Sequence, residues 1–166
     1  GNTPCFYNHF VTDREESFDQ PGTPEEPKGH YIFDKPEPLW NFGHGKSYTT
    51  FDYVDCALSD TLLVASDTLK VSVTIKNTGR RDGKEVVQLY VRDKVSTVAT
   101  PIQQLKAFQK VLIKPGESQC VELSLPIAEL ALYNAKMEEV VEPGDFEIQI
   151  GAASDDIRFK KTITIN

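Results

Sequence analysis

Apolar and polar residues alternate through much of the chain after residue 48. Leu69, Val71, Val73 and Ile75 are separated from one another by a lysine, a serine and a threonine. Successive side chains of a β-strand point to opposite faces, so this period of two predicts a strand with one face in a core and the other in water. Shorter runs of the same kind fall at residues 87–91, 121–125, 146–150 and 157–165. The pattern is typical of several half-buried strands.

Segments that contain glycine or proline separate these runs. Residues 77–83 are predicted to form a hairpin connection, with positive φ angles at its glycines. Turns are expected at residues 114–117 and 142–145, and the one helical candidate is a single turn near residues 128–130. About seven short strands without a long helix predict an all-β fold, a two-sheet sandwich of the immunoglobulin type.

Residues 1–47 have a different texture. They contain six of the ten prolines and acidic runs at residues 13–16 and 25–26, so helix and central strand are disfavoured and an extended N-terminal tail is expected. Two apolar islands, residues 5–11 and 39–42, carry aromatic side chains. A flexible linker has little use for aromatic residues, so these islands are predicted to dock onto another surface.

Charge and length limit the classes of partner. The chain has 166 residues, enough for one domain with some length left over, and a formal net charge of -7. This charge opposes binding to nucleic acid and to anionic membranes, and no stretch reaches the roughly 20 apolar residues of a membrane span. The chain opens with Gly1 and its one methionine is Met137, which favours a piece of a longer protein whose targeting segment lies upstream.

Metal and nucleotide chemistry find little support. The odd number of widely spaced cysteines predicts buried or half-buried free thiols, and a Cys5/His9 metal pair lacks a second close-spaced pair. Residues 43–47 end like a phosphate-binding loop, but Trp40 stands where that loop needs its first glycine. No cofactor and no metal are therefore expected. The three histidines are interpreted as surface residues, and they are His9, His30 and His44.

Hydrolytic and sugar-binding chemistry is also weakly indicated. Adjacent acids such as Glu138-Glu139 point to opposite faces of a strand, whereas glycoside hydrolysis needs two carboxyls that face each other across a cleft. Sugars stack on exposed aromatic rings, so a carbohydrate-binding module is an alternative. The rings that carry this alternative are Trp40, Tyr48, Tyr53, Tyr90 and Tyr133.

One run carries a more specific signal. Residues 38–51, with the sequence PLWNFGHGKSYTTF, resemble the signature P-L-[YW]-P-F-G-[YH]-G-L-S-Y-T-x-F that precedes the last domain of glycoside hydrolase family 3, the β-glucosidase and β-xylosidase family. Asn41 replaces the usual proline and Lys46 the usual leucine. Upstream, Tyr7-Asn8-His9 and Arg14 are similar to the end of the family's preceding α/β-sandwich domain, where Asp13 replaces the usual glycine. The resemblance continues through residues 75–79, 83–91, 105–111, 115–117, 141–146 and 150–157.

The resemblance implies a non-catalytic role. Enzymes of this family take an aspartate nucleophile from a barrel and a glutamate acid/base from a middle α/β domain, and neither region matches this chain. The resemblance implies a fibronectin type III-like sandwich at residues 48–166, a wrapping linker at 13–47 and a remnant of the α/β domain at 1–12. Such a domain packs against the catalytic domains of its own parent chain and stabilises them; a sugar-binding module or an adhesion domain is the alternative. Interdomain packing is expected at Phe6, Tyr7, Trp40, Phe42, Tyr48 and Phe51.

Two further expectations follow from the same resemblance. The first segment, without its former partners, is expected to lie on the sandwich edge, to disorder, or to pair weakly with another copy. A periplasmic or secreted location is expected for a polysaccharide-degrading parent. The sugar that the parent cleaves is left open, because its subsites would lie outside this sequence.

Overall fold

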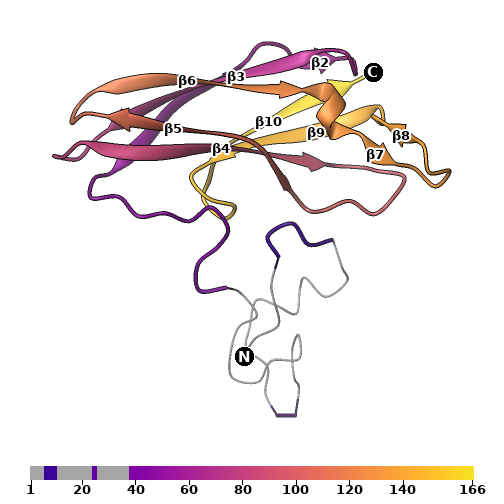
Figure 1. Ribbon diagram of the computed structural model, residues 1–166, viewed down its shortest axis with the longest axis horizontal. Coiled ribbons are helices and arrows are strands. Elements are labelled where there is room, and N and C mark those ends of the chain that lie inside the picture. The colour runs from indigo at the N-terminus through magenta and orange to yellow at the C-terminus, as the bar shows by residue number, and fades with distance from the viewer. Residues whose placement is uncertain (1–5, 11–23, 26–37) are drawn as a thin grey trace.

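The computed structural model describes residues 6–10, 24–25 and 38–166, and its strands form two packed sheets (Figure 1). One sheet has the order β1-β3-β6 and the other the order β2-β10-β9-β4-β5, with a small pair β7-β8 beside them. The first sheet is made of β1 (Phe51–Leu58), β3 (Thr68–Asn77) and β6 (Ser118–Pro126). The second is made of β2 (Leu62–Leu63), β4 (Gly83–Asp93), β5 (Gln104–Ile113), β9 (Gly144–Gly151) and β10 (Ile157–Ile165). The predicted two-sheet sandwich is confirmed.

Three short elements complete the chain. The 3₁₀-helix η2 (Ile127–Leu130) is the single turn that the sequence suggested, and it leads into β7 (Leu132–Tyr133) and β8 (Glu139–Val140). Gly116 has a φ of 76°, as the predicted turn at residues 114–117 requires.

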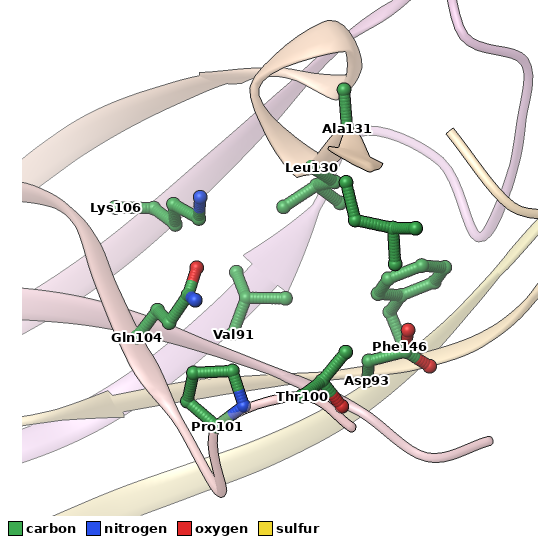
Figure 2. A pocket seen from close by; sticks show the side chains of 10 residues that line it. Val91, Asp93, Thr100, Pro101, Gln104, Lys106, Leu130, Ala131 and Phe146 are labelled. Atoms are coloured by element: carbon green, nitrogen blue, oxygen red, sulfur yellow. The ribbon is translucent and has the colours of Figure 1, made fainter. Parts of the chain in front are cut away.

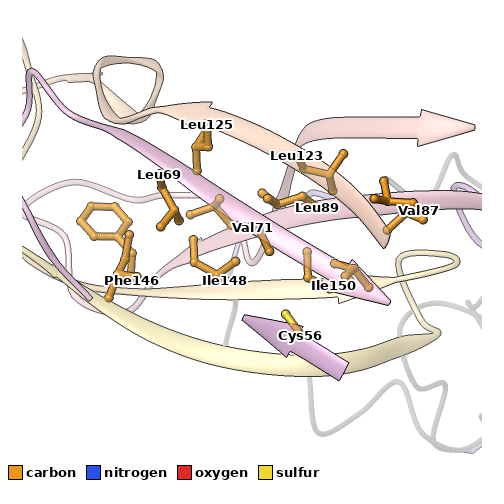
Figure 3. Close-up of a cluster of buried hydrophobic side chains, with 14 of the residues drawn as sticks. Cys56, Leu69, Val71, Val87, Leu89, Leu123, Leu125, Phe146, Ile148 and Ile150 are labelled. Carbon is orange, nitrogen blue, oxygen red and sulfur yellow. The ribbon is translucent and has the colours of Figure 1, made fainter. Parts of the chain in front are cut away.

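The core lies between the sheets and is built by the alternating residues. Leu69 and Val71 of β3 face Leu89 of β4 and Ile148 and Ile150 of β9, and all five side chains are fully buried (Figure 3). Fully burying one such side chain is worth about 1.5–3 kcal/mol. The sandwich therefore rests on these aliphatic contacts.

Residues 77–83 do not form the predicted hairpin. β3 pairs with β1 and β6, whereas β4 pairs with β5 and β9, so the segment carries the chain from one sheet to the other. Both strands bury a face in the same core, and an alternating pattern cannot distinguish a hairpin partner from a strand in the facing sheet. The positive φ angles expected at Gly79 and Gly83 are also absent.

The glycines of this crossover serve close approach instead. A Cβ atom at Gly79 would lie 2.0 Å from Thr49 Oγ1, and one at Gly83 would lie 2.3 Å from Thr49 Cγ2. Both distances are far below van der Waals contact, so residues 47–51 can pass here only because no side chain is present.

Asn77 fixes the same corner. Its side chain is fully buried, and its amide nitrogen donates to the carbonyl oxygens of Arg81 and Ile113, each at 2.8 Å. Its Oδ1 accepts from Thr49 Oγ1 at 2.6 Å and from the Gly79 amide at 3.0 Å. One polar side chain thus joins the crossover, the end of β5 and the N-terminal side of β1.

The cysteines follow the expectation only in part. Cys56 of β1 is buried in the core, but Cys120 of β6 is exposed, because its place in the alternation is on the outer, polar face of the three-stranded sheet. Cys5 lies outside the described residues, as does His30.

Candidate docking surface

Two N-terminal segments, residues 6–10 and 38–50, lie on the same side of the sandwich (Figure 1). Their rings meet where Tyr7 stacks on Phe42, with ring centroids 4.0 Å apart and an interplanar angle of 11°. Tyr7 also meets Tyr90 of β4 edge-on, with centroids 6.0 Å apart. Such aromatic pairs are worth about 0.5–1.5 kcal/mol beyond their buried area. We call Tyr7, Phe42 and the residues beneath them the tail anchor.

Hydrogen bonds complete the tail anchor. Tyr90 is fully buried although it points away from the core, and its hydroxyl donates to Gln88 Oε1 at 2.5 Å. Gln88 Nε2 donates to the carbonyl oxygens of Gly43 at 3.1 Å and Ala152 at 2.5 Å. Burial raises the pKa of the Tyr90 phenol, so it remains a donor at neutral pH. Gly43 has a φ of 82° and a Cβ there would lie 2.1 Å from Gln88 Oε1, so this approach requires glycine.

Further hydrogen bonds hold both segments in place. The backbone carbonyl oxygen of His9 accepts a hydrogen bond from the Ile102 amide at 2.9 Å, next to a β-bridge between Phe10 and Pro101. Asn41 Nδ2 donates to Asp155 Oδ2 at 2.7 Å. The asparagine that departs from the family signature is therefore a tether in this chain.

The same segments leave large apolar side chains uncovered. The exposed fractions are 66% for Phe6, 51% for Phe10, 86% for Leu39 and 56% for Trp40. The Trp40 ring lies beside the His44 ring, at 4.7 Å between centroids, and Lys46 Nζ lies over it, 4.7 Å from its centroid. Clustered exposed apolar residues are typical of interaction sites. We call Phe6, Phe10, Leu39 and Trp40 the exposed tail surface.

The six residues expected to pack against another domain fall into three groups. Phe6 and Trp40 belong to the exposed tail surface, while Tyr7 and Phe42 form the tail anchor. Tyr48 is 92% exposed and lines a groove, and Phe51 is half-buried against the core. Sequence reasoning did not find Leu39 or Phe10 as exposed residues, although both belong to its apolar islands.

That groove has a volume of about 640 Å³ and runs between residues 43–51, β1 and β4. Two of its carboxylates have partners. Glu85 accepts a hydrogen bond from the Tyr53 hydroxyl at 3.0 Å. Asp156 pairs with the Arg158 guanidinium, with Arg158 Nε 2.6 Å from Oδ1 and Arg158 Nη2 2.8 Å from Oδ2. Burial raises the pKa of Glu85, and burial followed by the Glu85 charge raises that of Tyr53. Glu85 and Asp156 are thus each engaged with a neighbouring side chain, whereas glycoside hydrolysis requires two carboxyls that face each other across a cleft.

A second cavity lies beside η2 and is lined by Leu130 of that element, Val91 of β4 and Phe146 of β9, with Pro101 and Thr100 on the side away from η2 (Figure 2). Its volume of about 60 Å³ holds roughly two water molecules, at about 30 Å³ each. A saccharide does not fit. Its one carboxyl group, Asp93, has no acidic neighbour in the lining.

Two features are absent from the described residues. No group of three or more histidine, cysteine, aspartate or glutamate side chains gathers there in a metal-binding arrangement. Within the same residues, no helix has the length and hydropathy for crossing a membrane.

Comparisons with known proteins agree with the fold. Residues 85–154 match the family model of the fibronectin type III-like domain. A β-xylosidase of Formosa agariphila is 44% identical over 133 residues, which cover 79% of this chain and 18% of that protein. A periplasmic β-glucosidase of Salmonella typhimurium is 36% identical over 157 residues, covering 93% of this chain and 20% of that protein.

A solved structure gives the same picture. The crystal structure of a β-glucosidase from Listeria innocua superposes with a TM-score of 0.79 at 34% identity, covering 97% of this chain and 22% of that one. The chain thus spans about a fifth of the length of the relatives it matches.

Proposed function

This chain belongs to the fibronectin type III-like domains of glycoside hydrolase family 3, and from this premise we propose that it is a non-catalytic accessory domain that stabilises the catalytic part of a larger enzyme. The observation that carries the proposal is the exposed tail surface, which places large apolar side chains in water on segments already fastened to the sandwich. An isolated domain gains nothing from this exposure, whereas a neighbouring domain could bury it.

The proposed parent hydrolyses β-glucosides or β-xylosides, the substrates in the names of the relatives. Its catalytic aspartate and glutamate would lie in regions that this chain does not match. We propose that residues 1–12 continue the preceding domain, 13–47 link the two, and 48–166 form the accessory domain. A periplasmic or secreted location is part of the proposal, supported by the name of the Salmonella relative.

The sugar-binding alternative has less support at Trp40. Stacking on a sugar requires a free ring face, and the Trp40 ring is already in contact with His44 and Lys46. The adhesion alternative would need an apolar patch unrelated to the tail, whereas Phe6, Phe10 and Trp40 are exposed rings of the tail itself.

The proposal is tested by comparing this chain with the longer polypeptide. This chain alone should not turn over an aryl β-glucoside or an aryl β-xyloside. The double variant Leu39→Ser, Trp40→Ser should lower the thermal midpoint of the longer polypeptide and leave that of this chain unchanged, because only the longer polypeptide buries both residues. Tyr133→Ser, also at a largely exposed aromatic residue, is the matched control. Turnover by this chain, or equal effects of the double variant in both proteins, would refute the proposal.

A further inference from the structure

The outer face of the five-stranded sheet carries a set of side chains that take no part in the core. β4 and β5 pair antiparallel, and residues opposite each other in such a pair point to the same face. On the face away from the core, the paired residues are Lys84 with Leu112, Val86 with Lys110 and Gln88 with Phe108. Phe108 is 66% exposed and Leu112 is 54% exposed. We call these six residues the β4–β5 face.

The β4–β5 face adjoins the N-terminal segments. Gln88, which lies opposite Phe108, donates to the carbonyl oxygen of Gly43 and so holds the segment that carries the tail anchor. Val86 and Lys110 line the groove of about 640 Å³ that this segment forms with the sandwich. The exposed tail surface and the β4–β5 face are thus connected through one chain segment, and one neighbouring surface can cover both.

The charge around the groove is the reverse of the charge of the chain. Its lining holds four lysines and arginines against three carboxylates, whereas the whole chain has 18 against 25. Two of the three carboxylates are already engaged, one with Arg158 and one with the Tyr53 hydroxyl. No ion pair holds Lys46, Lys84 or Lys110 within the part of the chain that the structure describes. Complementary charge favours association, so this wall suits an anionic partner.

Protection of a sheet edge does not account for the β4–β5 face. β5 is the last strand of its sheet, and a lysine on such an edge discourages pairing with another chain. Phe108 and Leu112, on either side of Lys110, have the opposite effect, because exposed apolar side chains on an edge favour association. A face with both kinds of side chain is suited to a partner that supplies apolar groups and carboxylates together.

We propose that the β4–β5 face and the adjoining groove form a second contact with the catalytic part of the parent enzyme, through a segment rich in aspartate or glutamate. This inference rests on the proposed function and adds the chemistry of the partner. Apolar side chains of that segment cover Phe108 and Leu112, and its carboxylates pair with Lys84 and Lys110. A symmetric pair of two copies of this chain fits poorly, because it would bring the lysines of the two faces together.

The test compares the acetylation rates of single lysines in this chain and in the longer polypeptide, by brief labelling with acetic anhydride and mass spectrometry. Lys136, an exposed lysine between β7 and β8, is the internal reference. Relative to Lys136, Lys84 and Lys110 should react about fivefold more slowly in the longer polypeptide, because an amine that is covered and paired with a carboxylate is less accessible to the reagent. Equal relative rates in the two proteins would overturn the proposal.

A charge reversal tests the chemistry of the partner. Lys110→Glu should lower the thermal midpoint of the longer polypeptide by about 1–3 °C in 20 mM salt and by less than half as much in 500 mM salt, because salt screens charge interactions. The midpoint of this chain should not change, since Lys110 is exposed there. Lys136→Glu, the same change elsewhere on the surface, is the control and should not affect either protein. A Lys110→Glu effect that is absent or independent of salt would overturn the anionic partner.

These outcomes also separate this inference from the proposed function. If the Leu39→Ser, Trp40→Ser double variant destabilises the longer polypeptide alone while Lys84 and Lys110 remain reactive in it, the accessory role stands and the second contact is wrong. Slow labelling of both lysines in this chain by itself, lost on dilution, would assign the β4–β5 face to a second copy and overturn the proposal as well.

Discussion

The sandwich and the two N-terminal segments treat their large apolar side chains in opposite ways. Ile148 and the other core residues of β3, β4 and β9 are removed from water, whereas Leu39 and Trp40 remain largely in it. Both regions are apolar in sequence, but only one closes on itself. The sandwich is therefore stabilised by its own core, while the N-terminal segments are held in place but keep large apolar side chains exposed.

Truncating a core side chain should give the largest loss of stability and shows how strongly the sandwich depends on its buried residues. Ile148→Ala removes three carbons from a fully buried position and should lower the free energy of unfolding by about 2–5 kcal/mol. Domains of this kind have only about 5–15 kcal/mol in total. Urea denaturation followed by circular dichroism measures the change.

Trp40→Ala is the matched control, because it removes a larger side chain from the exposed tail surface. Its effect should stay within about 0.5 kcal/mol, as is usual for exposed positions. If Ile148→Ala and Trp40→Ala lowered the free energy of unfolding by similar amounts, the two regions would not differ in the way described.

Asn77 should give the next largest effect, because it joins the two regions. Asn77→Ala leaves the Ile113 carbonyl and the Gly79 amide without a partner and should lower the free energy of unfolding by about 2–3 kcal/mol. Thr50→Ala, which removes an exposed hydroxyl bonded to Thr78, is the control and should cost far less. A loss below about 0.5 kcal/mol for Asn77→Ala would mean that this corner does not hold the tail, since one unpaired buried group alone costs more.

A substitution at Glu85 should give the smallest change in the free energy of unfolding, and that change should depend on pH. Burial raises its pKa in the folded state above the ordinary value of a glutamate. At pH values between the unfolded-state pKa and the folded-state pKa, the folded protein therefore keeps a proton that the unfolded chain has released. Its contribution to stability is therefore greatest below that window and falls as the pH rises through it. Glu85→Gln has no proton to lose, so the wild type should lose stability relative to this variant as the pH rises from about 4 to about 7.

Urea midpoints of the two proteins, measured at several pH values, test this prediction. The expected change in their difference is a few tenths of a molar. A difference in urea midpoint that does not change with pH would contradict the placement of Glu85 in a desolvated position. A wild-type midpoint that rises relative to that of Glu85→Gln as the pH rises would contradict it as well.

Sequence periodicity predicted the sandwich because burial in a two-sheet core follows strand alternation residue by residue. The four aliphatic residues 69, 71, 73 and 75 are all fully buried, as expected. The partner of each strand was not predictable in this way. Residues 77–83 connect two sheets rather than two paired strands, and alternation looks the same in both cases.

The candidate site was predictable as a set of aromatic residues but not as an arrangement. The apolar islands indicated docking, yet only the structure separates Tyr7, which meets Tyr90, and Phe42, which stacks on Tyr7, from the largely exposed Phe6 and Trp40. Tyr90 was one of the rings that carried the sugar-binding alternative, but in the structure it is fully buried and Tyr7 of the tail meets it edge-on. Contacts between residues more than 80 positions apart leave no local pattern in the sequence.

The most direct test of the contrast is urea unfolding of residues 48–166 alone beside the full chain. Loss of the tail anchor should lower the free energy of unfolding by about 1–3 kcal/mol, roughly two aromatic contacts, while the transition stays cooperative. A shortened chain without a cooperative transition would contradict the account, because the sandwich would then depend on the tail. An unchanged free energy would also contradict it, because the tail would then not be anchored at all.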